Sequence, residues 1–202
     1  MIDRHTVARL VTHVAHARDS VTQNHADMTA VISRMLAEAM QLDTAAVNDI
    51  VDAALLHDIG KTVIPDAILM KPGRLDAAER AVMSAHTRRG HDLLREARHP
   101  SLDVAAEVAL CHHENFDGSG YPRGIQGEAI PLASRIVSVA DVYEALCAAR
   151  PYKAGLSHAE ACRIILEGDG RTSPACFDPA VLAAFRRREA EIAQLKGRAA
   201  AA

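Results

Sequence analysis

The fold is decided by the stretch from residue 47 to residue 61, which reads Val47-Asn48-Asp49-Ile50-Val51-Asp52-Ala53-Ala54-Leu55-Leu56-His57-Asp58-Ile59-Gly60-Lys61. Its apolar residues recur at the three- and four-residue spacing of one helix face. The stretch therefore predicts a helix that buries this face and ends at His57 and Asp58. An unpaired imidazole or carboxylate is costly to bury, so this helix end is a candidate for chemistry.

The same helical spacing dominates the rest of the chain. It recurs over residues 7–14 and 28–39, and no convincing alternating strand pattern competes with it. Helix starts are marked by Asp76 with Glu79 and by Ser157 with Glu160, which have the spacing of a capping box. These patterns predict an all-α fold, a bundle of about eight or nine helices with one long glycine-rich loop at residues 116–127.

Composition limits the classes of function. With 202 residues the chain is one generous domain, and its net charge of −3 argues against bulk binding to a nucleic acid polymer or an anionic membrane. No apolar run approaches the roughly 18 residues of a membrane span, and nothing resembles a signal peptide. Four scattered cysteines fit reduced thiols, so the expected location is the cytoplasm.

The chain divides into three expected segments. Residues 1–18 form an N-terminal helix, residues 19–185 form the main domain, and residues 186–202 are a helix end and tail. The apolar stripe of the first helix, at residues 7, 10, 11 and 14, suits either a homodimer or packing on its own domain. The chain would be a stand-alone protein or a fragment of a longer one.

Polar side chains at the ends of apolar helical stretches form a candidate metal site. Five segments contribute, and their candidate ligands are His25, His57, Asp58, His86, His112, His113 and Asp141. One such histidine alone is more often a hydrogen-bonded core residue, and His13, His16, His91, His99 and His158 are interpreted as surface or structural. Nitrogen and oxygen donors without cysteine suit iron, manganese or zinc. A carboxylate such as Asp58 can bridge two ions about 3.5–4 Å apart.

The motifs at residues 57–61 and 112–122, His-Asp-Ile-Gly-Lys and His-His-Glu-Asn-Phe-Asp-Gly-Ser-Gly-Tyr-Pro, closely resemble the signature of HD-GYP domains, a branch of the HD phosphohydrolases. The resemblance covers about residues 19–185. It implies an all-α HD-domain bundle with a GYP loop and two or three iron or manganese ions. It also implies hydrolysis of cyclic di-GMP to the linear dinucleotide and often on to GMP.

By residue matching, the seven candidate ligands take the family's metal positions, and Lys61 takes that of its phosphate-side lysine. Asp58 and Lys61 are therefore the expected catalytic residues. Arg150 and Lys153 take positions that bind the substrate's phosphates or guanine. Val21 stands where members with three metals carry glutamate, which favours two ions, with zinc or a third ion as alternatives.

Two further departures preserve charge: Glu144 stands where aspartate is usual, and Lys153 where arginine is commoner. Replacing arginine by lysine loses bidentate geometry.

The glycine-rich loop and the proton donor allow more than one interpretation. Gly118 and Gly120 allow close approach of backbone to a ligand or a sharp turn, and Tyr121 could stack on a base or cover the core. Asp117, Glu114 and a metal-bound water are all candidate general acids. In some members of the family the loop is associated with diguanylate cyclase partners.

Two other functions compete with the phosphodiesterase. One is a phosphohydrolase that acts on another cyclic dinucleotide or a nucleotide. The other is a non-catalytic module that binds cyclic di-GMP or a partner, against which the intact ligand set counts.

Overall fold

The computed structural model describes residues 6, 8, 11–12, 20–148 and 154–199. Its α-helices and 3-10 helices agree with the predicted all-α fold, and these ranges contain no strand. Apart from the single turn α4, every α-helix has eight residues or more, which confirms the prediction of eight or nine helices. The α-helices are α2 (Ser20–Ala39), α3 (Thr44–Leu56), α4 (Asp66–Leu69), α5 (Ala77–Ser84), α6 (His86–Glu96), α7 (Asp103–Cys111), α8 (Leu132–Cys147), α9 (His158–Glu167) and α10 (Pro179–Ala199). The 3-10 helices are η1 (Ile59–Val63), η2 (Pro100–Leu102), η3 (Gly127–Ala129) and η4 (Pro174–Cys176).

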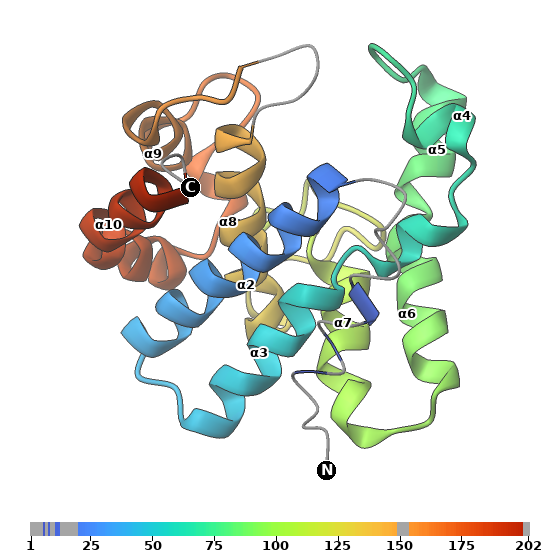
Figure 1. Ribbon diagram of the computed structural model, residues 1–202, viewed down its shortest axis with the longest axis horizontal. Helices are drawn as coiled ribbons and strands as arrows, with labels where there is room; N and C mark the ends of the chain where they lie inside the picture. Colours follow the sequence, from blue (N-terminus) through green and yellow to red (C-terminus); the bar gives the residue numbers. More distant parts are fainter. Residues whose placement is uncertain (1–5, 7, 9–10, 13–19, 149–153, 200–202) are drawn as a thin grey trace.

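Four helices form the centre of the bundle. α2 packs against α3 and α8, and α3 packs against α7. Around them, α6 covers α7 on one side, while α9 and α10 lie beside α8 on the other (Figure 1). The apolar faces predicted from the spacing point inward, so that Ile32, Leu36 and Leu55 are fully buried. No helix in the described ranges is long and apolar enough to cross a bilayer.

Helix starts follow the capping signals in the sequence. Asp76 with Glu79 and Ser157 with Glu160 both form complete capping boxes, in which each side chain accepts a hydrogen bond from the other residue's backbone amide. α10 starts at Pro179, where the missing amide proton costs nothing. The two capping boxes correctly placed the first turns of α5 and α9.

Two segments contain more helix than the sequence predicts. The connection from residue 64 to residue 74 contains α4, which begins after Pro65, whose φ of −59° is already compatible with a helical turn. At the other end, α10 continues through Ala199, and Ile192 is fully buried. Packing therefore extends the last helix beyond residue 185.

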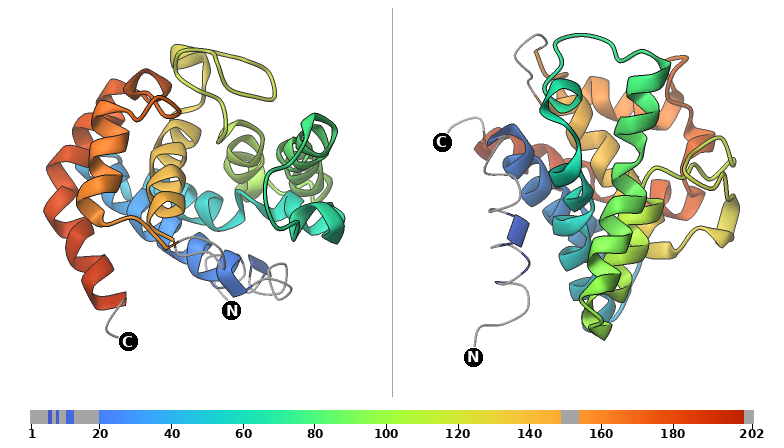
Figure 2. Two further views of the ribbon diagram at one scale, coloured as in Figure 1. Left: turned by 90° about the horizontal axis from the view of Figure 1, so that it is seen from above. Right: turned by 90° about the vertical axis from the view of Figure 1, so that its right-hand side faces the viewer.

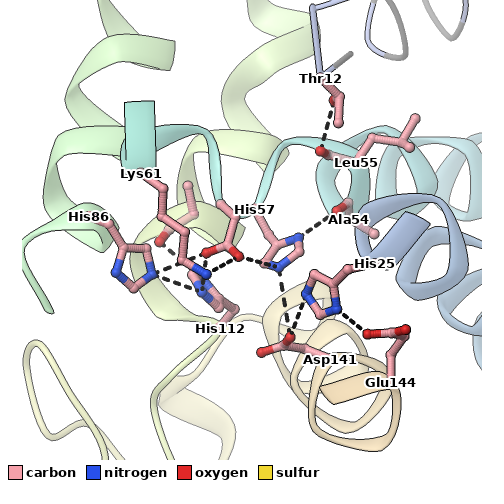
Figure 3. Close-up of polar contacts among 12 residues, drawn as sticks. Thr12, His25, Ala54, Leu55, His57, Lys61, His86, His112, Asp141 and Glu144 are labelled. Atoms are coloured by element: carbon pink, nitrogen blue, oxygen red, sulfur yellow. Dashed lines mark hydrogen bonds and ion pairs between the residues drawn. The ribbon is translucent and has the colours of Figure 1, made fainter. Parts of the chain in front are cut away.

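The described N-terminal residues pack on the domain itself. Ala8 and Thr12 are buried, and the Thr12 hydroxyl lies 2.9 Å from the carbonyl oxygens of Ala8 and Leu55 (Figure 3). Of the stripe considered for a homodimer, only Val11 lies within the described residues, and it is exposed. These contacts support packing of this segment on its own domain.

A close approach between η1 and α6 follows directly after the His57-Asp58 pair. A Cβ atom at Gly60 would lie 1.9 Å from the carbonyl oxygen of His86 and 2.5 Å from the amide nitrogen of Gly90. Only glycine therefore lets the two backbones touch. Because Asp58 precedes Gly60 by two residues and His86 opens α6, this contact brings their side chains together.

We predict that Gly60→Ala lowers the free energy of unfolding by about 3 kcal/mol, because backbone atoms cannot move aside as a flexible side chain would. Gly127→Ala is the matched control, since its Cβ would meet no atom within 4 Å and the change adds only the strain of a φ of +60°. Urea denaturation of the metal-free chain measures both. Equal losses in the two variants would contradict the proposed close contact.

Candidate metal centre

The structure brings all seven predicted ligand side chains to one place inside the bundle, and Figure 3 shows His25, His57, His86, His112 and Asp141 among them. His25 comes from the second turn of α2, Asp141 from α8, and His86 from the first turn of α6. His57 and His112 are the C-cap residues of α3 and α7, and Asp58 and His113 follow them. Neighbouring imidazole rings lie 4.1–5.4 Å apart, centroid to centroid, through the series His25, His57, His112, His113 and His86.

The Asp58 carboxylate lies at the middle of this cluster. Its Oδ1 atom is 3.3 Å from Nε2 of His86 and 3.8 Å from Nε2 of His112. Its Oδ2 atom is 3.3 Å from Nε2 of His57 and 2.5 Å from Nζ of Lys61. One carboxylate oxygen thus faces each group of histidines, which is the arrangement that a bridging ligand needs.

Backbone carbonyls fix the protonation of three of the imidazoles. The Nδ1 atoms of His57, His86 and His112 lie 2.7, 2.8 and 3.0 Å from the carbonyl oxygens of residues 54, 83 and 108. A carbonyl oxygen can only accept, so each Nδ1 must donate its proton. In the neutral ring, Nε2 then carries a lone pair that points into the cluster, as in histidines that bind metals.

These lone pairs have no adequate partners within the described residues. Nε2 of His86 and Nε2 of His112 face each other at 3.4 Å, and burial lowers the pKa of both rings, so neither nitrogen supplies a proton to the other. His57 Nε2 and Asp58 Oδ1 are buried without a hydrogen-bond partner. Buried acceptors that converge on one another fit a bound cation.

On the α2 and α8 side, His25 lies between two carboxylates. Its Nε2 atom is 3.1 Å from Asp141 Oδ1, and its Nδ1 atom contacts Glu144 Oε2. Asp141 and Glu144 are three residues apart on α8 and share one face. Sequence reasoning noted Glu144 only as a departure from the family pattern and missed its role as the group that orients His25. Its signal was the three-residue spacing from Asp141.

Three sets of three donors could each hold an ion, with their ligand atoms within 4.8 Å of one another. Nitrogen and oxygen are the only donor atoms, which fits iron, manganese or zinc. The sets are His86, His112 and His113; His25, His57 and Asp58; and His57, His112 and Asp141.

The predicted substrate residues have different surroundings. Lys61 is partly exposed and its ammonium group contacts Asp58, so it lies at the edge of the cluster. The ring of Tyr121 stacks on His113 with centroids 4.8 Å apart, which places it beside the candidate ligands. Arg150 and Lys153 lie outside the described residues.

Gly118 and Gly120, the two glycines predicted to contact substrate, have local structural reasons. Gly118 has a φ of +82°, in the region that favours glycine. A Cβ at Gly120 would lie 2.3 Å from the amide nitrogen of Asn115 and 2.4 Å from the carbonyl oxygen of His113. Their contact with substrate stays a prediction.

Of the two carboxyls considered as general acids, Asp117 is exposed and accepts hydrogen bonds from the Ser119 hydroxyl and amide, which lower its pKa. It is therefore ionised at neutral pH and a poor proton donor. Glu114 is buried, and its Oε1 atom accepts the Arg123 amide proton at 2.7 Å.

Electrostatics divide the histidines of the metal-free chain into two kinds. Burial alone would lower the pKa of His25, but hydrogen bonds to Asp141 and Glu144 outweigh it and raise the pKa to about 10. Burial lowers the pKa of His113 to about 4, despite the nearby carboxylates. In the metal-free chain, the proton on His25 thus balances negative charge of the neighbouring carboxylates, which a bound cation would otherwise balance.

We predict that in the metal-free chain at pH 8 His25 carries protons on both ring nitrogens, whereas His113 is neutral. Nitrogen-15 chemical shifts of the histidine rings, followed between pH 5 and pH 11, measure this. The His25 signal should titrate near pH 10, since a raised pKa keeps the ring charged until the pH exceeds it. Titration of His25 near its ordinary value of about 6.5 would contradict the paired geometry.

Comparison with known proteins places this cluster in a family. The profile described as "HD domain" matches residues 9–181. The chain is 41% identical to the cyclic di-GMP phosphodiesterase response regulator RpfG of Xanthomonas campestris, over 96% of this chain and 50% of that protein. It is 43% identical to the 3'3'-cGAMP-specific phosphodiesterase 2 of Vibrio cholerae, over 76% of this chain and 30% of that protein. The chain therefore spans half or less of the length of these relatives.

A solved structure shows the same fold. The HD domain of the L. monocytogenes phosphodiesterase PgpH, in complex with cyclic di-AMP, superimposes with a TM-score of 0.65 at 19% identity, over 93% of this chain and 96% of that one. The matched profile contains the motif at His57 and Asp58. The chain belongs to the HD-domain family, in its HD-GYP branch.

Proposed function

We propose that this chain is a metal-dependent phosphodiesterase that hydrolyses cyclic di-GMP to the linear dinucleotide or to GMP. The observation that carries the proposal is the Asp58 carboxylate, one oxygen of which faces His86 and His112 while the other faces His57. This arrangement suits two divalent ions, iron or manganese, that share Asp58. The names of the relatives, which are phosphodiesterases of cyclic dinucleotides, support the substrate class.

The ligands would divide into two sets around Asp58. His25, His57 and Asp141 would join it on the α2, α3 and α8 side, and the other set is His86, His112 and His113. When bound, the ions supply Lewis-acid activation of water at neutral pH and neutralise phosphate charge. Glu144 holds the His25 ring in position, and the carbonyls behind His57, His86 and His112 do the same for those rings. Such supporting contacts are worth about 10–100-fold in metal affinity.

Lys61 would act on the substrate itself. Its position at the edge of the cluster, anchored on Asp58 and partly exposed, lets its ammonium group meet a phosphate that enters from solvent. A phosphoryl transition state spreads negative charge over its equatorial oxygens, and a fixed cation stabilises that charge. Tyr121, stacked on His113, offers a ring face next to the same place for a base.

The proposal extends to the organisation of the chain. Residues 19–185 would be the catalytic unit, between the N-terminal helix and a C-terminal segment from residue 186. The loop from Asp117 to Gly124 is exposed or half-exposed throughout, so it could also contact a diguanylate cyclase partner. A chain whose relatives are about twice as long could receive its signal from a further domain.

Turnover of a substrate panel tests the function. We expect anaerobically purified chain supplied with iron or manganese to convert cyclic di-GMP to linear dinucleotide or GMP, followed by chromatography. Preference for 3'3'-cGAMP would support the second candidate function, a phosphodiesterase of another cyclic dinucleotide. The name of the Vibrio cholerae relative supports this candidate. No turnover of any cyclic dinucleotide by metal-loaded chain would contradict the enzyme proposal.

We predict that Lys61→Met lowers turnover about 100–1,000-fold while metal content stays unchanged, because the lysine stabilises the transition state and is not a metal ligand. Lys71→Met is the matched control, since Lys71 pairs with Glu79 at a distance from the cluster. Steady-state kinetics and metal analysis of both variants measure the effect. Wild-type turnover in Lys61→Met would remove the lysine from the mechanism.

A further inference from the structure

A second group of potential metal ligands comes from α9 and α10, the two helices that lie beside α8 in Figures 1 and 2. His158 and Cys162 are one turn apart on α9 and therefore share a face of that helix. Glu189 comes from α10. The ligand atoms of these three residues lie within 4.8 Å of one another. The sequence alone gave no reason to connect them, and His158 was interpreted there as a surface or structural residue.

The His158 ring is held through Nδ1, and its other nitrogen lies near the other two residues. Nδ1 lies 2.8 Å from the hydroxyl of Tyr143, a fully buried residue of α8. When Nδ1 donates its proton to this oxygen, Nε2 keeps its lone pair. Nε2 is 3.5 Å from Sγ of Cys162 and 4.0 Å from Oε1 of Glu189. The sulfur is also 3.7 Å from Nδ1, so it lies beside the ring. A histidine oriented through its other nitrogen is a general feature of metal sites.

The separations fit tetrahedral coordination. Metal–nitrogen bonds of about 2.05 Å and metal–sulfur bonds of about 2.3 Å place the two donor atoms of a tetrahedral zinc site about 3.6 Å apart. The observed nitrogen-to-sulfur distance is 3.5 Å, and because the sulfur lies beside the ring, the Cys162 side chain would rotate to meet an ion held by Nε2. The Glu189 side chain is 44% exposed, so its carboxylate can close the remaining gap by a small rotation.

We propose that His158, Cys162 and Glu189 form a second metal site, which binds a borderline divalent cation such as zinc and ties α9 to α10. The donors are one nitrogen, one sulfur and one oxygen, which suits zinc. This site is separate from the proposed catalytic centre, whose donors include no sulfur. It is independent of phosphodiesterase activity.

Binding at this site exchanges a proton for the cation. Burial raises the pKa of the Cys162 thiol to about 12, so the sulfur carries its proton at neutral pH. On binding, the S–H bond breaks, a sulfur–metal bond forms and the proton leaves to solvent. The cation would then link α9 to α10, and α10 extends beyond residue 185, the end of the proposed catalytic unit.

Cobalt(II) titration of the metal-free full chain tests the proposal. A cobalt–thiolate bond gives a near-ultraviolet charge-transfer band, which nitrogen and oxygen ligands at the other centre cannot produce. We expect this band in the wild-type chain and in Cys176→Ser, and its loss in Cys162→Ser. In Glu189→Gln, a change at an exposed position that leaves folding intact, we expect cobalt affinity from this band to fall by about tenfold or more.

Circular dichroism checks that Cys162→Ser is folded. If that variant does not fold, the cobalt affinity of Glu189→Gln still tests the proposal. Absence of the band from wild-type chain with excess cobalt would overturn the proposal. So would a band that persists in folded Cys162→Ser, or one that is unchanged in affinity in Glu189→Gln.

Discussion

Burial of the Asp58 carboxylate among imidazole nitrogens is the constraint on which the rest of the structure depends. Backbone carbonyls force the lone pairs of His57, His86 and His112 toward the same small space. Converging acceptors in a low-dielectric interior repel one another and are costly to keep there. A bound cation turns this cost into attraction, so the same contacts that strain the metal-free chain prepare it to hold metal.

The helices serve this cluster through their ends and faces. α3 and α7 each end at a histidine, and α6 begins with one, so three helix ends meet at one point. The glycine contact between Gly60 and α6 sets how closely two of them approach. α8 contributes to both sides of the molecule, because Asp141 and Glu144 face the cluster while Tyr143 contacts His158 of α9.

Local patterns in the sequence predicted the helices and the capping boxes, and they supplied the candidate ligands that the structure brings together. Apolar spacing and caps act over a few residues, and they are legible without the fold. The convergence of distant residues cannot be read in this way: the positions of His25 and Asp141 in apolar helical stretches made them candidate ligands, and the motif resemblance then matched both to metal positions. The orienting role of Glu144 and the packing role of Gly60 depend on helix contacts, and the His158 cluster depends on how α9 meets α10. Of these, only Glu144 has a local signal, its three-residue spacing from Asp141.

Metal content of the wild-type chain and of Asp58→Asn tests the central claim most directly. Both proteins are purified anaerobically with iron or manganese and measured by mass spectrometry, and Asp92→Asn, an exposed position on α6, serves as the control. Removal of zinc by a chelator, or the same measurement in a Cys162→Ser background, keeps metal at the proposed second site out of this count. The account predicts about two ions per chain in the wild type and control, and loss of both from Asp58→Asn with helicity preserved. Retention of both ions by the variant would contradict a shared carboxylate at the centre of the site.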